Sequence, residues 1–82
     1  MQKVLTERAN AGAFELEYHL LEESREDGRK DYGIEVCSSS GDGDCVRGIT
    51  VCREEAAALL HLLARNTVTP VTLRNVVEDW LP

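Results

Sequence analysis

Apolar side chains change their spacing along this chain near Cys52, from every second residue to every third or fourth residue. Before this point, alternate positions of one segment are apolar: Phe14, Leu16, Tyr18 and Leu20. After it, apolar residues recur with the spacing of a helical stripe: Ala56, Leu59, Leu60 and Leu63. A strand buries every second side chain, whereas a helix buries residues three to four positions apart. The sequence therefore predicts strands in the first part of the chain and helices in the second.

The length and charge of the chain restrict its class. Its 82 residues are enough for one small domain. Acidic residues outnumber basic ones by 15 to 9 and the basic ones are scattered, so we expect no nucleic-acid partner. No apolar run approaches the ~20 residues of a membrane span, and the first residues do not resemble a signal peptide. We therefore expect a cytoplasmic protein, with no membrane partner and with reduced cysteines.

The spacing pattern predicts a single α+β domain at residues 13–82 after a flexible N-terminal arm at residues 1–12. Three strands are expected, at residues 13–23, 29–38 and 45–51, with a bulge at Gly48. The predicted fold is a three-stranded antiparallel β-meander followed by two α-helices packed on one face of the sheet.

The helix ends are assigned from capping signals. The first helix is predicted to begin at Arg53 behind Cys52, and to end at a left-handed Asn66. The second follows Thr72, and Trp80 is expected to anchor it to the rest of the domain. Its apolar face is predicted to contain Leu73, Val76, Val77, Trp80 and Leu81.

The turn between the first two strands determines which side chains face the core. A shift of one residue between paired strands turns every side chain to the other face. A two-residue turn at Asp27 and Gly28 would pair inward-facing residues of one strand with outward-facing residues of the other. A three-residue loop at residues 26–28, with a left-handed Gly28, restores the match. The predicted pairs are Tyr18 with Val36, Leu20 with Ile34, and His19 with Glu35.

Several segments resemble a known family. The segments EYHLLEE, DYGIEV and NTVTPVTLRNVVEDWL are similar to those of a family of short bacterial proteins, the domain of unknown function 6514. The resemblance extends from Phe14 to Leu81, and its clearest markers are Tyr32-Gly33-Ile34 and Val68-Thr69-Pro70. It implies no activity, ligand or catalytic residue.

The outward face of the first two strands carries the candidate functional residues. The predicted register places four potential ligands next to one another: Glu17, His19, Glu35 and Cys37. Imidazole, thiolate and carboxylate groups can together bind zinc. The simpler interpretation is a polar face in water. A nucleophilic pair of His19 and Cys37 would also need a pocket and an oxyanion donor, so we expect no catalytic residue, no enzyme activity and no cofactor.

Two functional hypotheses follow. The first is a non-catalytic protein-interaction or regulatory module that binds an unidentified, basic partner through an acidic sheet face formed by Glu15, Glu17, His19, Asp31 and Glu35. The alternative is a metal- or thiol-responsive sensor that uses His19, Cys37 and the neighbouring carboxylates. A weak homodimer is also expected, because the first strand would be an unpaired edge. Alternatively, residues 1–12 fold back and cover that edge, which leaves a monomer.

Overall fold

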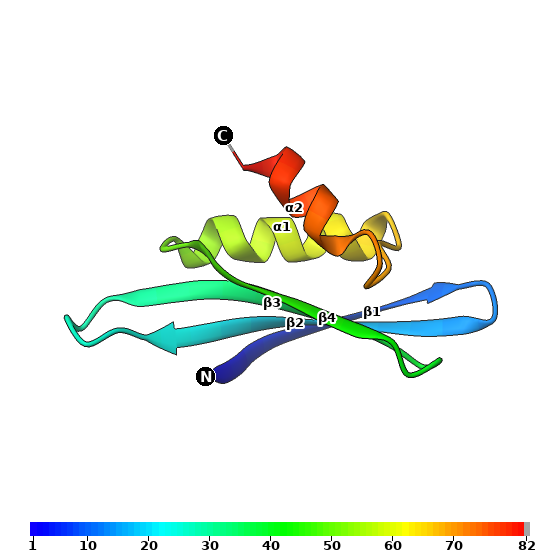
Figure 1. The fold of residues 1–82 in the computed structure, drawn as a ribbon, viewed down its shortest axis with the longest axis horizontal. Coiled ribbons are helices and arrows are strands. Elements are labelled where there is room, and N and C mark those ends of the chain that lie inside the picture. The colour runs from blue at the N-terminus through cyan, green and yellow to red at the C-terminus, as the bar shows by residue number, and fades with distance from the viewer. Residues whose placement is uncertain (82) are drawn as a thin grey trace.

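The computed structural model describes residues 1–81 as a four-stranded antiparallel sheet covered on one face by two helices (Figure 1). The elements are β1 (Gln2–Ala11), β2 (Phe14–Ser24), β3 (Lys30–Ser38), β4 (Gly43–Thr50), α1 (Arg53–Arg65) and α2 (Leu73–Trp80). The strands lie side by side in sequence order. The predicted α+β class and antiparallel sheet are confirmed. No helix within the described residues is long and apolar enough to cross a membrane.

The prediction of a three-stranded sheet is wrong by one strand, because residues 2–11 form β1 instead of a flexible arm. The register of β1 shifts between Lys3 and Leu5, and the consecutive residues Val4 and Leu5 both pack against the core. Beyond this bulge, inward positions carry alanine or glutamate as well as leucine. The alternation is therefore too weak to identify the strand from sequence. Since β1 pairs with β2, β2 is not the free edge from which self-association was predicted.

The loop between β2 and β3 has the predicted length and conformation. The Arg25 N–H donates to the Arg29 carbonyl oxygen at 2.7 Å, and Gly28 has a φ of 84°. A glycine tolerates this left-handed conformation without steric penalty. The predicted cross-strand pairs are confirmed: Tyr18 with Val36, Leu20 with Ile34, and His19 with Glu35.

Strand β4 contains the predicted bulge at Gly48, which has a φ of 64°. The register of β3 and β4 shifts between Tyr32 and Ile34, so the bulge lies opposite Gly33. A Cβ atom on Gly33 would lie 2.5 Å from the carbonyl oxygen of Val46. The absence of a side chain at Gly33 therefore allows the bulged backbone to approach β3.

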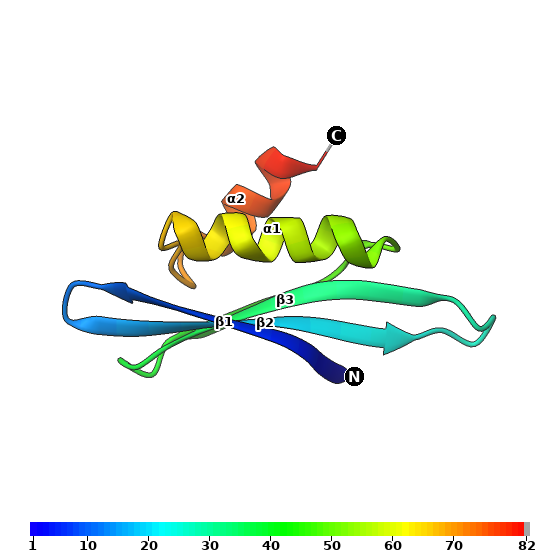
Figure 2. The same ribbon diagram turned by 180° about the vertical axis from the view of Figure 1, so that it is seen from behind.

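The two helices cover different parts of the sheet. Helix α1 contacts all four strands, while α2 packs against β4 and rises away from the sheet toward its C-terminal end (Figure 2). Side chains from the sheet, the helices and the connection between the helices form one buried core. Its members are Leu16, Tyr18, Leu20, Tyr32, Ile34, Val36, Ala56, Leu59, Leu60, Leu63, Val68, Leu73 and Val77. Within it, the Tyr18 hydroxyl donates to the Val68 carbonyl oxygen at 2.8 Å. This bond fixes the connection between the helices to a central strand.

The end of α1 differs from the prediction by one residue. Asn66 has a φ of −93°, and the left-handed residue is Thr67, with a φ of 48°. The N–H groups of Thr67 and Val68 donate to the carbonyl oxygens of Ala64 and Leu63, at 3.2 and 3.0 Å, as in a Schellman cap. A β-branched residue is rare in this conformation, which explains why the asparagine was the stronger sequence signal.

One side chain lies in an environment that differs from the prediction. Phe14 was expected on the core face but is 48% exposed, because it is the first residue of β2. His61 is exposed on α1, and its Nδ1 atom contacts Glu7 Oε1 of β1. This contact joins α1 to the strand that was not predicted.

The close approach at Gly33 predicts a large difference between two glycine substitutions. Gly33→Ala should lower the free energy of unfolding by about 1–3 kcal/mol, because its methyl group would overlap the β4 backbone. Gly43→Ala is the control, since a Cβ there would meet the Val36 carbonyl oxygen at an ordinary 3.6 Å. Urea unfolding of both variants checks the prediction, and equal midpoints would contradict it.

The contact between Asp44 of β4 and Arg74 of α2 predicts a pH-dependent stability. Arg74 Nε donates to Asp44 Oδ2 at 3.0 Å, and hydrogen bonds from the Cys45 N–H and from Arg74 lower the pKa of Asp44. A lowered folded-state pKa stabilises the protein above the unfolded value of 3.8, and this stability is lost as pH falls through the folded value. We expect Asp44→Asn to lower the urea midpoint at neutral pH but not at a pH well below 3.8.

Asp42→Asn provides the matched control for this measurement. The Asp42 carboxylate accepts a long hydrogen bond from Ser40, at 3.5 Å, in the loop before β4. Its replacement should leave the midpoint unchanged at both pH values. If the urea midpoint of Asp44→Asn lies below that of the wild type by the same amount at both pH values, the charge of Asp44 does not stabilise the fold.

Candidate functional site

The sheet face opposite the helices, here called the open face, carries the residues predicted to bind a partner or a metal (Figure 1). Directly paired residues of antiparallel strands point to the same face, so the register places their side chains. The open face includes Lys3, Thr6 and Arg8 from β1, Glu15, Glu17 and His19 from β2, Asp31, Glu35 and Cys37 from β3, and Cys45 from β4.

Most carboxylates of the predicted acidic surface are paired with cations. The ion pairs join Lys3 to Glu35 (3.7 Å), Arg8 to Glu17 (3.2 Å) and Arg25 to Asp31 (2.5 Å). Two of these cations come from β1, the strand that was not predicted. The open face therefore has alternating charges, which steer a basic partner less strongly than a uniformly acidic surface would. The geometry gives the predicted basic partner no specific support on this face.

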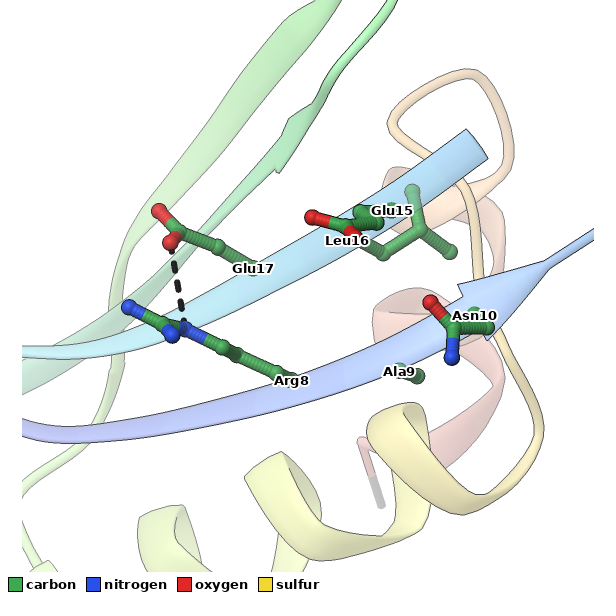
Figure 3. A pocket seen from close by; sticks show the side chains of 6 residues that line it. All are labelled: Arg8, Ala9, Asn10, Glu15, Leu16 and Glu17. Atoms are coloured by element: carbon green, nitrogen blue, oxygen red, sulfur yellow. Dashed lines mark ion pairs between the residues drawn. The ribbon is translucent and has the colours of Figure 1, made fainter. Parts of the chain in front are cut away.

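A shallow hollow lies where β1 and β2 run side by side. Figure 3 shows Arg8 and Glu17 joined across it, with Asn10 and Glu15 further along the same strands. The side chain of Arg8 is 77% exposed and that of Glu17 is 42% exposed, so water screens their attraction. The hollow is a polar surface feature and does not enclose a ligand.

His19 is the most constrained polar residue of the open face. It is only 7% exposed, although it was predicted to lie in water. Its Nδ1 atom lies 3.0 Å from the Thr6 hydroxyl oxygen, and its Nε2 atom lies 3.5 Å from Glu17 Oε1. The orientation of His19 was thus predicted correctly, and its burial was missed because β1 was missed. Thr6 and Glu17 together fix the plane of the imidazole ring.

His19, Glu35 and Cys37 form a compact group of potential metal ligands. One ligand atom from each residue lies within 4.8 Å of the other two. Glu35 lies directly opposite His19 on β2, and Cys37 follows two residues along the same face of β3. Cys45 of β4 lies directly opposite Glu35 on its other side. Three adjacent strands thus bring an imidazole, a carboxylate and two thiols to one region.

The environment of the two thiols disfavours nucleophilic chemistry. Burial raises the pKa of both Cys37 and Cys45, and the nearby carboxylate of Glu35 adds to each increase. The thiolate is the reactive nucleophile, so a raised pKa makes each free thiol less reactive. The expectation that His19 and Cys37 are not a catalytic pair stays a prediction. Metal ligation remains compatible with this environment, because a bound cation displaces the thiol proton.

The sequence identified the three residues of this group but not all of their neighbours. Glu17, His19, Glu35 and Cys37 lie together as predicted, although Glu17 is also engaged by Arg8. Sequence reasoning did not place Cys45 opposite Glu35 or Thr6 beside His19. The register of β4 could have revealed Cys45, but the bulge at Gly48 obscured that register. Nothing in the sequence signalled Thr6, because its strand was not recognised.

Comparison with known proteins gives a family but no activity. The model of a family of unknown function, DUF6514, matches residues 1–82. No curated protein and no solved structure matches the chain.

Proposed function

We propose that this chain, which belongs to the family of unknown function DUF6514, is a small regulatory module that binds a zinc ion on its open face. The observation that carries the proposal is the group of His19, Glu35 and Cys37, whose ligand atoms lie within 4.8 Å of one another. Zinc prefers nitrogen and sulfur ligands in tetrahedral sites, with carboxylate oxygens as a third choice. The role proposed here is binding and not catalysis.

The spacing of the three ligands is close to that of a zinc site. Tetrahedral ligands at the usual bond lengths of 2.0–2.3 Å lie about 3.6 Å from one another. The separation of up to 4.8 Å must therefore shrink by roughly an ångström. Rotation of the Glu35 and Cys37 side chains can supply this change, whereas the buried ring of His19 keeps its place. The backbone of the sheet does not have to move.

Cys45 is the proposed fourth ligand, and its thiol lies outside the compact group of three, on the other side of Glu35. Directly paired residues have Cβ atoms about 4.5–5.5 Å apart, and Cys45 is paired with Glu35. The set of His19, Glu35, Cys37 and Cys45 then gives one nitrogen, one oxygen and two sulfur ligands. Thr6 supports this set, because the His19 tautomer with a proton on Nδ1 donates to the Thr6 hydroxyl and leaves Nε2 for the metal.

Lys3 provides a competing cation inside the same group. Its ammonium nitrogen lies 3.7 Å from Glu35 Oε1, so an incoming zinc ion and Lys3 share one carboxylate. Zinc would also join β2, β3 and β4, which are otherwise connected through their ladders. Because a ligand that binds only the folded state stabilises it, zinc at a hundredfold excess over Kd would add about 2.7 kcal/mol. This coupling of metal level to stability is the proposed regulatory response.

Titration of reduced protein with zinc or cobalt tests this function. The wild type should bind about one equivalent, and cobalt should show the absorption of thiolate ligation. Cys37→Ser and His19→Gln should each weaken binding by at least about tenfold. Lys3→Gln should bind more tightly, because it removes the cation that competes for Glu35.

Cys52→Ser is the matched control for the cysteine variants. Cys52 is the third free thiol and lies at the start of α1, on no strand of the open face. Its replacement should leave both affinity and the cobalt spectrum unchanged. Circular dichroism of each variant separates loss of a ligand from loss of the fold. Absence of binding by the folded wild type, or equal weakening by Cys52→Ser, would overturn the proposal.

A further inference from the structure

The layer of helices contains a second surface, independent of the proposed metal site and on the other side of the sheet. A groove of about 530 Å³ lies between the first part of α1, the end of α2 and the end of β4, and it is lined by Ile49, Thr50, Glu55, Ala58, Trp80 and Leu81. Helix α2 rises away from the sheet as it approaches its C-terminal end (Figure 1).

The floor of the groove is apolar and accessible. Leu81 is 41% exposed and Trp80, the single tryptophan of the chain, is only partly buried. Leu62 lies one helical turn beyond Ala58 on the same side of α1 and is 37% exposed. Tryptophan is enriched among the residues that anchor protein interfaces, and Trp80 is accessible here. The sequence prediction that Leu81 belongs to the packed face of α2 is therefore wrong, since Leu81 follows the helix and lines the groove.

The helix turns that form the groove carry four carboxylates, of which Glu55 lines the groove itself. Glu55 lines the groove and Glu54 precedes it in the first turn of α1, while Glu78 and Asp79 directly precede Trp80 in the last turn of α2. Among the described residues, none of these four carboxylates takes part in an ion pair. The last turn of α2 contains no basic residue, and its exposed carbonyl groups add partial negative charge.

We propose that this groove binds the apolar face of a basic amphipathic helix from another protein. The floor of the groove would receive the apolar side chains of the partner helix. The lysine or arginine residues that flank those side chains on the partner helix would lie near the four carboxylates. A second copy of this chain does not fit as well, because it would bring eight like charges to one interface, two sets of four. A neutral apolar helix would leave the rim charges without partners. The charge pattern thus selects a cationic occupant.

A synthetic helix of leucine and lysine, with its leucines at helical spacing, is the probe for this surface. Its glutamate counterpart, with the same leucine pattern, is the matched negative peptide. The lysine peptide should shift the emission of Trp80 to shorter wavelength, because binding removes water from the indole ring. Its affinity should fall with added salt, which screens the rim charges. The glutamate peptide should bind at least about tenfold more weakly.

Substitutions in the protein separate the groove from unspecific attraction. Leu62→Ser and Leu81→Ser should each lower the affinity for the lysine peptide by about tenfold, as expected for apolar residues at the centre of an interface. Val71→Ser is the matched control, because Val71 is 81% exposed but lies in the connection between the helices, away from the groove. The double variant Glu55→Gln, Asp79→Asn should reduce the dependence of affinity on salt.

Three outcomes would overturn the proposal. One is equal affinity for the lysine and glutamate peptides, since the rim charges would then have no role. Another is equal weakening by Val71→Ser, which would place the contact outside the groove. The last is a dimer in sedimentation measurements that Leu81→Ser abolishes, because the groove would then be covered by a second copy. Unfolding curves of each variant confirm that the fold is intact, so a change in affinity reports the surface.

Discussion

The register between β2 and β3 is the constraint on which the rest of the structure depends. The three-residue loop closed by Arg25 and Arg29 sets Tyr18 opposite Val36 and His19 opposite Glu35. A slip of one residue would move His19 into the core and turn Tyr18 toward water. The hydroxyl of Tyr18 would then lose the Val68 carbonyl oxygen that it now reaches across the core. One loop length therefore determines the helix-packing face, the donor group of the open face and the anchoring of the connection between the helices.

The bulge of β4 has a similarly wide influence, and it requires a glycine on the neighbouring strand. The bulge lies opposite Gly33, so residues before it keep regular pairing and Cys45 remains opposite Glu35. On the open face, Leu21 of β2 is the other neighbour of Gly33 and is only 5% exposed. The same small residue thus admits the bulged backbone on one side and a leucine side chain on the other. A packing requirement in this region explains Gly33 without any ligand.

The sequence predicted the elements whose patterns are regular and missed those that depend on partners distant in the chain. A clear apolar period of two residues identified β2 and β3, and a period of 3.6 residues identified α1. The requirement that inward-facing residues lie opposite one another gave the register between β2 and β3. β1 has a bulge near Lys3 and alanines at inward positions, and it is stabilised by contacts that periodicity does not show, such as Glu7 with His61. The burial of His19 and the neutralisation of the open face follow from β1, so both were missed with it. Propensity also misplaced the end of α1, because tertiary packing of Val68 holds Thr67 in a conformation that favours glycine.

The two proposed binding surfaces lie on opposite sides of the sheet, yet they share β4. Cys45 is the ligand that this strand would give to the metal, and Ile49 and Thr50 are the residues that it gives to the groove. Thr50 also donates to Glu55 at 3.2 Å, so the end of the strand is tied to the first turn of α1. A metal that holds Cys45 and a helix that packs on Ile49 would both restrict the same edge strand.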